Sequence, residues 1–168
     1  MNHQSTLEAK TNKLNQIGLE EKNSKELAKK LNILLANYSI FYQNIRGYHW
    51  NLKGSRFFEL HSKFEELYGN LYLKIDEIAE RIATLGYIAN HNFSDYRVES
   101  KIAEKTLVSD CKVATMDILN SFKTILTLQR EILSLADEMG DEGTYNLISD
   151  AIIEQEKTVW MYSASIEE

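Results

Sequence analysis

The sequence of 168 residues contains no proline and only seven glycines. Proline interrupts helices and central strands, and it is the usual punctuation of loop-rich and all-β chains. Its absence therefore favours long helices over an all-β fold. The composition, 43% apolar and 26% charged residues, is typical of a globular chain rather than a disordered one. A chain of this length forms one domain with a sizeable core.

Cysteine is nearly absent, and long apolar runs are missing. Cys111 stands alone, which excludes an internal disulfide and favours a reducing cytoplasm. We expect it to be a small side chain that is buried or half-buried. No apolar run approaches the roughly 20 residues that a membrane-spanning helix needs. The first residues, MNHQSTLEAKTNKLNQ, have no apolar core, so we expect neither secretion nor a membrane partner.

Acidic residues outnumber lysine and arginine, and the formal net charge is −6. Binding to the phosphates of nucleic acids is driven by lysine and arginine. The composition is therefore poorly suited to a large nucleic-acid surface. The same acidity is compatible with attracting cations.

Apolar residues recur at steps of three and four, which predicts four long amphipathic helices. We expect these helices over residues 24–51, 56–85, 103–139 and 144–163. A polar N-terminal tail covers residues 1–23, with a short helix considered only near residues 6–17. Asn23-Ser24 is the expected N-cap of the first long helix, and Gly86 is the expected C-cap of the second. Trp160 is expected in the core of the last helix.

The connections between these helices predict the topology. Residues 53–55 and 140–143 form short breaks, whereas the linker over residues 87–102 is long enough for one short helix. A long crossover makes the second and third long helices parallel, which is the ferritin-like four-helix bundle rather than an up-and-down bundle. The predicted domain covers residues 24–168. A bundle by itself does not define a function.

Four polar residues of the second helix share one face. At about 100° per residue, His61, Glu65, Asp76 and Glu80 fall at about 0°, 40°, 60° and 100°. The apolar stripe of the same helix is centred near about −80°, so the polar face points roughly 130° away from the bundle core. That stripe comprises Leu60, Phe64, Leu67, Leu71, Ile75, Ile78, Ile82 and Leu85.

One chain cannot bind a single metal ion with residues from both ends of this polar face, because the ends are too far apart. His61 and Asp76 are separated by about 22 Å of helix, whereas bonds from a metal to its ligands are about 2 Å long. Suppose instead that the helix packs antiparallel against its own copy about an axis between residues 70 and 71. His61 then lies level with the partner's Glu80, and Glu65 with the partner's Asp76.

The residues around this axis suit an interface between two copies. Gly69 permits close approach of the backbones, and Tyr72 and Leu73 offer surface to bury. His49 lies just before the break at Gly54, so an antiparallel hairpin brings it near the first end of the polar face.

The predicted metal site is therefore shared across a two-fold axis and occurs twice per dimer. It comprises His49, His61 and Glu65 of one chain with Asp76 and Glu80 of the other. Nitrogen and carboxylate ligands suit iron, manganese or zinc better than magnesium or calcium. The alternative interpretation is that all five are ordinary solvated groups. Trp50 stays open between the core and the site.

Three motifs resemble the Dps family, the DNA-binding proteins from starved cells, which are also called mini-ferritins. They are HWNxKG beginning at His49, FFxxH ending at His61 and DExAER beginning at Asp76, and KTVW beginning at Lys157 is also similar. The resemblance runs from about Ser24 to the end. It implies hollow dodecameric shells, built from dimers, in which Fe(II) is oxidised, preferably by hydrogen peroxide, and ferric iron is stored.

The resemblance also implies a role for individual residues. The family's iron ligands fall on His49, His61, Glu65, Asp76 and Glu80, and its site-adjacent tryptophan falls on Trp50. Many members carry aspartate where this chain has Glu65, so the longer side chain puts the metal affinity of that position in question.

Family members admit iron through acidic pores on three-fold axes near the start of the last helix. Asp141, Glu142 and Asp150 are the local candidates here. Acidic residues are also favoured at a helix N-terminus by the helix dipole alone.

Three functions are therefore compared. The first is a cytoplasmic ferroxidase and iron store that protects a bacterial cell and its DNA from oxidative damage. The second is a starvation protein that compacts DNA by direct binding in the nucleoid, which the acidic charge and the nearly neutral tail disfavour. The third is a structural bundle without metal.

Overall fold

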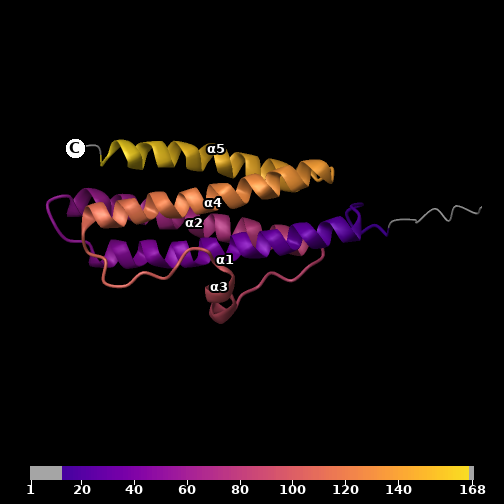
Figure 1. Cartoon of the computed structure of the whole chain (residues 1–168), viewed down its shortest axis with the longest axis horizontal. Coiled ribbons are helices and arrows are strands. Elements are labelled where there is room, and N and C mark those ends of the chain that lie inside the picture. Colours follow the sequence, from indigo (N-terminus) through magenta and orange to yellow (C-terminus); the bar gives the residue numbers. More distant parts are fainter. Residues whose placement is uncertain (1–12, 167–168) are drawn as a thin grey trace, which may run out of the picture.

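The computed structural model describes residues 13–166, which form five helices and no strand beyond isolated bridges. The helices are α1 (Glu21–Asn51), α2 (Phe57–Thr84), α3 (Phe93–Glu99), α4 (Cys111–Glu138) and α5 (Glu142–Ala164). Figure 1 shows that α2 and α4 run in the same direction, joined by the long crossover that carries α3. The predicted ferritin-like bundle with one crossover is confirmed.

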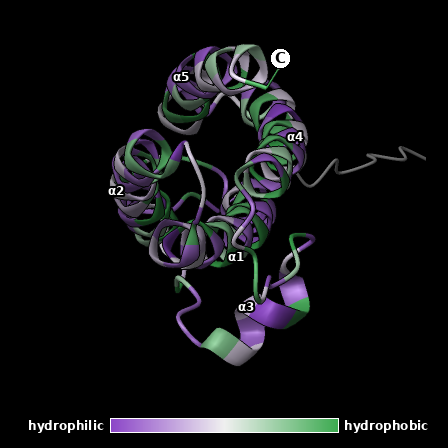
Figure 2. Cartoon of the chain, turned by 90° about the vertical axis from the view of Figure 1, so that its left-hand side faces the viewer, coloured by the Kyte–Doolittle hydropathy of each residue, from purple (hydrophilic) through white to green (hydrophobic). Residues whose placement is uncertain are grey.

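The four long helices surround a common core, and α3 stands outside them beside α1 (Figure 2). The predicted stripe of α2 faces this core, since all its members are buried except the half-buried Ile75. The rings of Phe41 and Phe122 meet edge to face with 5.1 Å between centroids, which ties α1 to α4. Each fully buried leucine, isoleucine or phenylalanine contributes about 1.5–3 kcal/mol of hydrophobic stabilisation.

Asparagine side chains of α1 hold the backbone of the crossover. Asn32, Asn37 and Asn44 each accept hydrogen bonds from crossover N–H groups through Oδ1. The donors are Asn90 for Asn32, Lys101 and Ile102 for Asn37, and Lys105 for Asn44. Because these contacts recur along the helix, the crossover follows α1.

The third long helix begins later than the sequence predicted. It starts at Cys111 rather than residue 103, and the Asp110 side chain caps it by accepting from the N–H of Val113. Leu107 has φ +57°, which a right-handed helix does not allow. Cys111 is half-buried, as expected, and its thiol donates to the Lys53 carbonyl.

The other helix ends lie within three residues of those predicted. α1 starts at Glu21 with Glu20 as its N-cap, not at Asn23-Ser24. α2 ends at Thr84, one residue before the predicted end, and Gly86 follows its C-cap with φ +93° and an N–H that bonds the Ala83 carbonyl.

Residues 13–20, which precede α1, fold back on the bundle instead of forming a free tail. Asn15 donates to Ser24 Oγ and to the Leu85 carbonyl, at the far end of α2. Residues 13–17 contain no helix. The remainder of the short helix considered near residues 6–17 lies outside the described residues, as does most of the predicted tail.

Trp160 is 67% exposed, so its predicted place in the core is wrong. The buried Ile152 defines the inward face of α5. Val159 lies about 20° from that face and Trp160 about 80° from it, because the helix advances about 100° per residue.

Candidate metal centre

Two histidines meet where α1 and α2 are joined. His49 lies in the last turn of α1 and His61 near the start of α2. The connection reverses through Gly54, whose φ of +116° favours glycine. The two imidazole rings stack with 3.8 Å between centroids and 18° between planes. The hairpin thus brings together two ligand candidates that are twelve residues apart in the chain.

Reciprocal hydrogen bonds orient both rings. Nδ1 of His49 donates to the His61 carbonyl at 2.8 Å, and Nδ1 of His61 donates to the His49 carbonyl at 2.9 Å. A carbonyl only accepts, so each Nδ1 carries a proton. In the neutral ring, Nε2 then keeps its lone pair. Metal-binding histidines commonly have this arrangement, with one nitrogen donating to a carbonyl and the other free to coordinate.

Aromatic rings enclose the histidine pair on both sides. Phe57 stacks on His61 with 4.9 Å between centroids, and Tyr68 and His49 meet edge to face with 5.3 Å between centroids. His49 is buried and His61 partly buried, so the rings have little freedom to turn away. Sequence reasoning did not assign these two aromatic residues. Phe57 precedes His61 by one helical turn and offers a local signal, whereas the Tyr68 contact depends on how α1 and α2 pack.

The three predicted carboxylates lie on the exposed side of α2. Glu65, one turn beyond His61, is exposed, and so are Asp76 and Glu80. The structure brings His49 and His61 together, but Asp76 and Glu80 lie farther along the same helix. Within residues 13–166 of one chain, no group of three or more His, Cys, Asp or Glu residues is arranged to hold a metal ion.

Apolar surface lies between the two ends of this carboxylate face. Tyr72 is 61% exposed and Leu73 is 57% exposed, and Gly69 is exposed beside them. These three residues face away from the core, as the helical angles predicted. A second copy packed here would bury them.

The centre of the bundle contains neutral polar groups instead of ligands. Tyr38, Gln129 and Gln155 are fully buried there. Asp141 is the only buried carboxylate among the described residues, and it forms an ion pair with Arg81. The interior therefore lacks the inward carboxylates of a bundle that binds metal along its own axis.

Trp50 lies next to His49 in the chain but outside the core. Its side chain is 57% exposed, and the Arg46 guanidinium carbon lies 4.7 Å from the ring centroid. A cation placed in this way over an indole ring is attracted by the electrons of the ring. The core interpretation of Trp50 is wrong.

Asp141 is not a free pore carboxylate within the chain. It caps α5 by accepting from the N–H and hydroxyl of Thr144, and its other partner is Arg81. Burial raises the pKa of Asp141, but these hydrogen bonds and the Arg81 charge outweigh burial and hold the pKa below its ordinary value. Glu142 and Asp150 are exposed and stay candidates.

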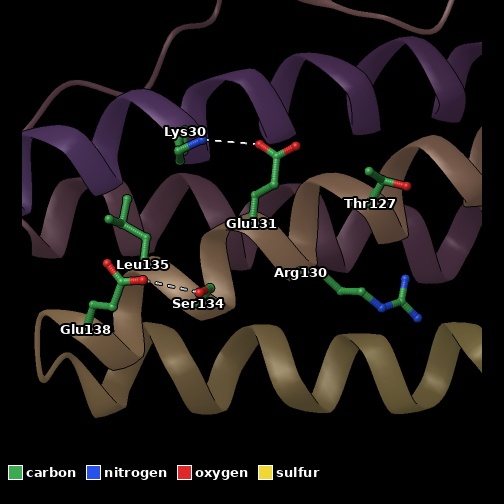
Figure 3. Close-up of a pocket in the computed structure, with 7 residues that line it drawn as sticks. All are labelled: Lys30, Thr127, Arg130, Glu131, Ser134, Leu135 and Glu138. Carbon is green, nitrogen blue, oxygen red and sulfur yellow. Dashed lines mark hydrogen bonds and ion pairs between the residues drawn. The ribbon is translucent and has the colours of Figure 1, made fainter.

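A surface hollow of about 580 Å³ lies between α1 and α4, far from the histidines (Figure 3). Lys30 reaches Glu131 across it as an ion pair, and Ser134 donates to Glu138. Lys30 precedes His49 by about 28 Å of helix. None of the predicted site residues lines the hollow, and Lys30 and Glu131 there already pair with one another.

Comparison with known proteins identifies the family. The model of the ferritin-like domain matches residues 28–168. The crystal structure of the DPS protein from Vibrio cholerae O1 superposes with a TM-score of 0.91 at 52% identity, covering 92% of this chain and 97% of that one. This chain belongs to the Dps family.

Relatives found by sequence agree with that family. A DNA protection during starvation protein of Porphyromonas gingivalis is 38% identical to this Dps chain, over 88% of the chain and 92% of the relative. An uncharacterized protein of Haemophilus influenzae is 53% identical over 89% of the chain and 93% of that protein. The Vibrio protein is described as a member of a broad superfamily of ferritin-like diiron-carboxylate proteins.

No helix among residues 13–166 combines the length and apolar character required to cross a membrane.

Proposed function

We propose that this Dps chain is a ferroxidase and iron store. It oxidises Fe(II), preferably with hydrogen peroxide, and keeps ferric iron inside a dodecameric shell in the bacterial cytoplasm, which protects the cell and its DNA. The observation that carries this proposal is the stacked histidine pair, whose Nδ1 atoms are committed to carbonyls so that both Nε2 atoms stay available. Kinship with a protein described as a diiron-carboxylate superfamily member supports iron as the metal.

The binding site for Fe(II) is shared between two chains. His49, His61 and Glu65 of one chain act together with the partner's Asp76 and the partner's Glu80. The exposure of the carboxylates on α2 supports this arrangement, because groups on the outer face are free to meet a second copy. The apolar surface between them supplies an interface of the isologous kind.

The chemistry avoids free radicals because electrons leave in pairs. Two Fe(II) ions give one electron each to one hydrogen peroxide, which takes up two protons and becomes two water molecules. Carboxylates stabilise the ferric product, since hard oxygen donors suit the higher charge. Trp50, close to His49 and exposed, is placed to quench any one-electron oxidant that escapes.

The test removes one predicted ligand from each end of the α2 face. His61→Ala combined with Asp76→Ala should lower the rate of peroxide-dependent Fe(II) oxidation by more than about 100-fold, since losing only the groups that orient metal ligands costs ~10–100-fold. The rate is followed by the absorbance of the ferric product. Light scattering reports assembly in the same samples.

The matched control changes two exposed glutamates of the same helix. Glu66→Ala with Glu77→Ala should keep the native rate, because these residues pair with Lys63 and Lys74 instead of facing the site. A double variant of His61 and Asp76 that oxidised Fe(II) at the native rate would overturn the proposal.

Direct compaction of DNA is the alternative, and the printed name of the Porphyromonas relative refers to DNA protection. The net charge of −6 per chain makes any assembly of many copies strongly acidic, which repels phosphate. We therefore expect no gel shift of duplex DNA near neutral pH and at physiological salt. A basic DNA-binding protein is the positive control, and a clear shift under those conditions would favour the alternative.

A further inference from the structure

Three side chains from three helices form a polar cluster in the middle of the bundle. Tyr38 comes from α1, Gln129 from α4 and Gln155 from α5, and none is more than 1% exposed. Nε2 of Gln129 donates to the Tyr38 hydroxyl oxygen at 2.8 Å, and Nε2 of Gln155 donates to the same oxygen at 2.5 Å. The cluster lies among apolar side chains of the core.

The side-chain amide oxygens of both glutamines take no part in these hydrogen bonds. Oε1 of Gln129 and Oε1 of Gln155 are buried and have no hydrogen-bond partner. Buried polar atoms in native proteins are nearly always paired. Turning either amide by 180° exchanges Nε2 with Oε1, but each glutamine still directs one atom to Tyr38 and leaves the other without a partner. Amide orientation therefore cannot complete the network.

The chemistry of the missing partner follows from counting donors and acceptors. Both lone-pair positions of the Tyr38 oxygen are engaged by the glutamines, but its own O–H remains to be donated. Burial raises the pKa of Tyr38, so the hydroxyl keeps its proton at neutral pH. With both Nε2 atoms directed at Tyr38, the partner must donate to two amide oxygens and accept from one hydroxyl. A metal cation cannot accept, and an anion cannot donate twice.

We propose that the bundle centre is a binding site for one buried water molecule held by Tyr38, Gln129 and Gln155. The water donates to the two Oε1 atoms and accepts from the tyrosine O–H. A total of about three hydrogen bonds is usual for a buried water. The site joins α1, α4 and α5 through a neutral layer, and it does not depend on the proposed reaction with iron.

A crystal structure of the unmodified protein, at a resolution that orders solvent, tests the site directly. We expect a single solvent peak within about 2.7–3.2 Å of both Oε1 atoms and the Tyr38 oxygen. Absence of a peak would overturn the proposal. So would a rearrangement in which the two glutamine amides bond each other directly.

A double variant asks whether the glutamines are the groups that bind the water. Gln129→Met with Gln155→Met removes both acceptors but fills a similar volume with flexible apolar side chains. We expect the solvent peak to be lost while the helices stay in place. A peak that persisted at the same position would show that other groups bind it and would overturn the assignment. If the variant does not fold, the structure of the unmodified protein decides alone.

Discussion

Asn37 lies in the middle of α1, although asparagine is a poor helix former. Its side chain is fully buried, and Oδ1 accepts from the N–H groups of Lys101 and Ile102 and from the hydroxyl of Ser100. The side chain thus satisfies two backbone donors of the crossover, of which the bond from Ile102 is buried. Each such bond contributes about 0.5–1.5 kcal/mol, which more than offsets the helix propensity that asparagine loses relative to alanine.

Removing this acceptor should be costly. We expect Asn37→Ala to lower the free energy of unfolding by about 1–3 kcal/mol, because the N–H groups of Lys101 and Ile102 lose their shared acceptor. Urea unfolding followed by circular dichroism measures the change. Asn120→Ala, at an exposed position of α4, is the control and should change the stability by less than about 0.5 kcal/mol. Equal stability of the two variants would contradict this role of Asn37.

The histidine pair illustrates what residue spacing can and cannot predict. The twelve-residue spacing and the glycine break predicted that His49 and His61 approach one another. The direction of each ring was not predictable, because it depends on the carbonyl that the other histidine presents across the hairpin. That orientation leaves Nε2 of both rings available for a metal.

At the scale of elements, an ion pair and a hydrogen bond connect the end of α2 to the start of α5. Arg81 forms an ion pair with Asp141 and donates from Nε to the Thr144 hydroxyl at 2.9 Å. A Cβ atom on Gly143 would lie 2.8 Å from Nη1 of Arg81, so glycine makes room for the guanidinium. The contact explains why α5 begins two residues earlier than predicted, since Asp141 is both its cap and the partner of Arg81.

The ion pair between Arg81 and Asp141 should make the stability of the fold decrease at acid pH. The pKa of Asp141 is lower in the folded chain, so its stabilisation is complete above the unfolded pKa and is lost as pH falls through the folded value. The loss therefore occurs below the ordinary aspartate pKa of about 3.9. We expect Asp141→Asn to be less stable at pH 7 and to lose less stability on acidification than the unmodified chain.

Chemical unfolding at a series of pH values measures both effects. Asp137→Asn, at an exposed position near the end of α4, is the control and should follow the unmodified chain closely. Identical pH profiles for the unmodified chain and Asp141→Asn would contradict the role of the ion pair.

The start of α4 was mispredicted because local pattern and distant contacts disagree. The sequence of residues 103–110 fits the helical pattern of the residues that follow it. Asn44, however, donates to the Ala103 carbonyl and accepts from the Lys105 N–H. In a helix that began at residue 103, the Ala103 carbonyl would instead accept from the N–H four residues farther on. The partner lies about sixty residues away in the chain, so no short window contains the information.

At the scale of the whole molecule, the candidate ligands divide into two groups along α2. The histidines and Glu65 lie toward one end of the helix, and Asp76 and Glu80 toward the other. A shared site predicts that two defective chains can complement one another. Consider a dimer of one His61→Ala chain and one Asp76→Ala chain. One of its sites carries both substitutions, and the other carries neither.

Mixing the two single variants should therefore restore activity that neither has alone. If dimers form at random, about half are mixed and about a quarter of all sites are intact. We expect peroxide-dependent Fe(II) oxidation to recover to about that fraction of the native rate after the variants are unfolded and assembled together.

The matched control mixes His61→Ala with His49→Ala. These substitutions affect the same half of the site, so every site in a mixed dimer stays defective and no activity should return. Recovery in this control, or none in the first mixture, would contradict a site shared in the proposed register.

The sequence alone determined the helical class and the outward direction of the carboxylate face, because a period of about 3.6 residues directly states which side chains share a face. It also determined the crossover topology, because the linker after the second helix is much longer than the other two connections. Only the tertiary structure decided the start of α4, the burial of Asp141 and the orientation of the imidazoles. Each of these depends on hydrogen bonds or packing between residues that are far apart in the chain, and a local period carries no record of such contacts.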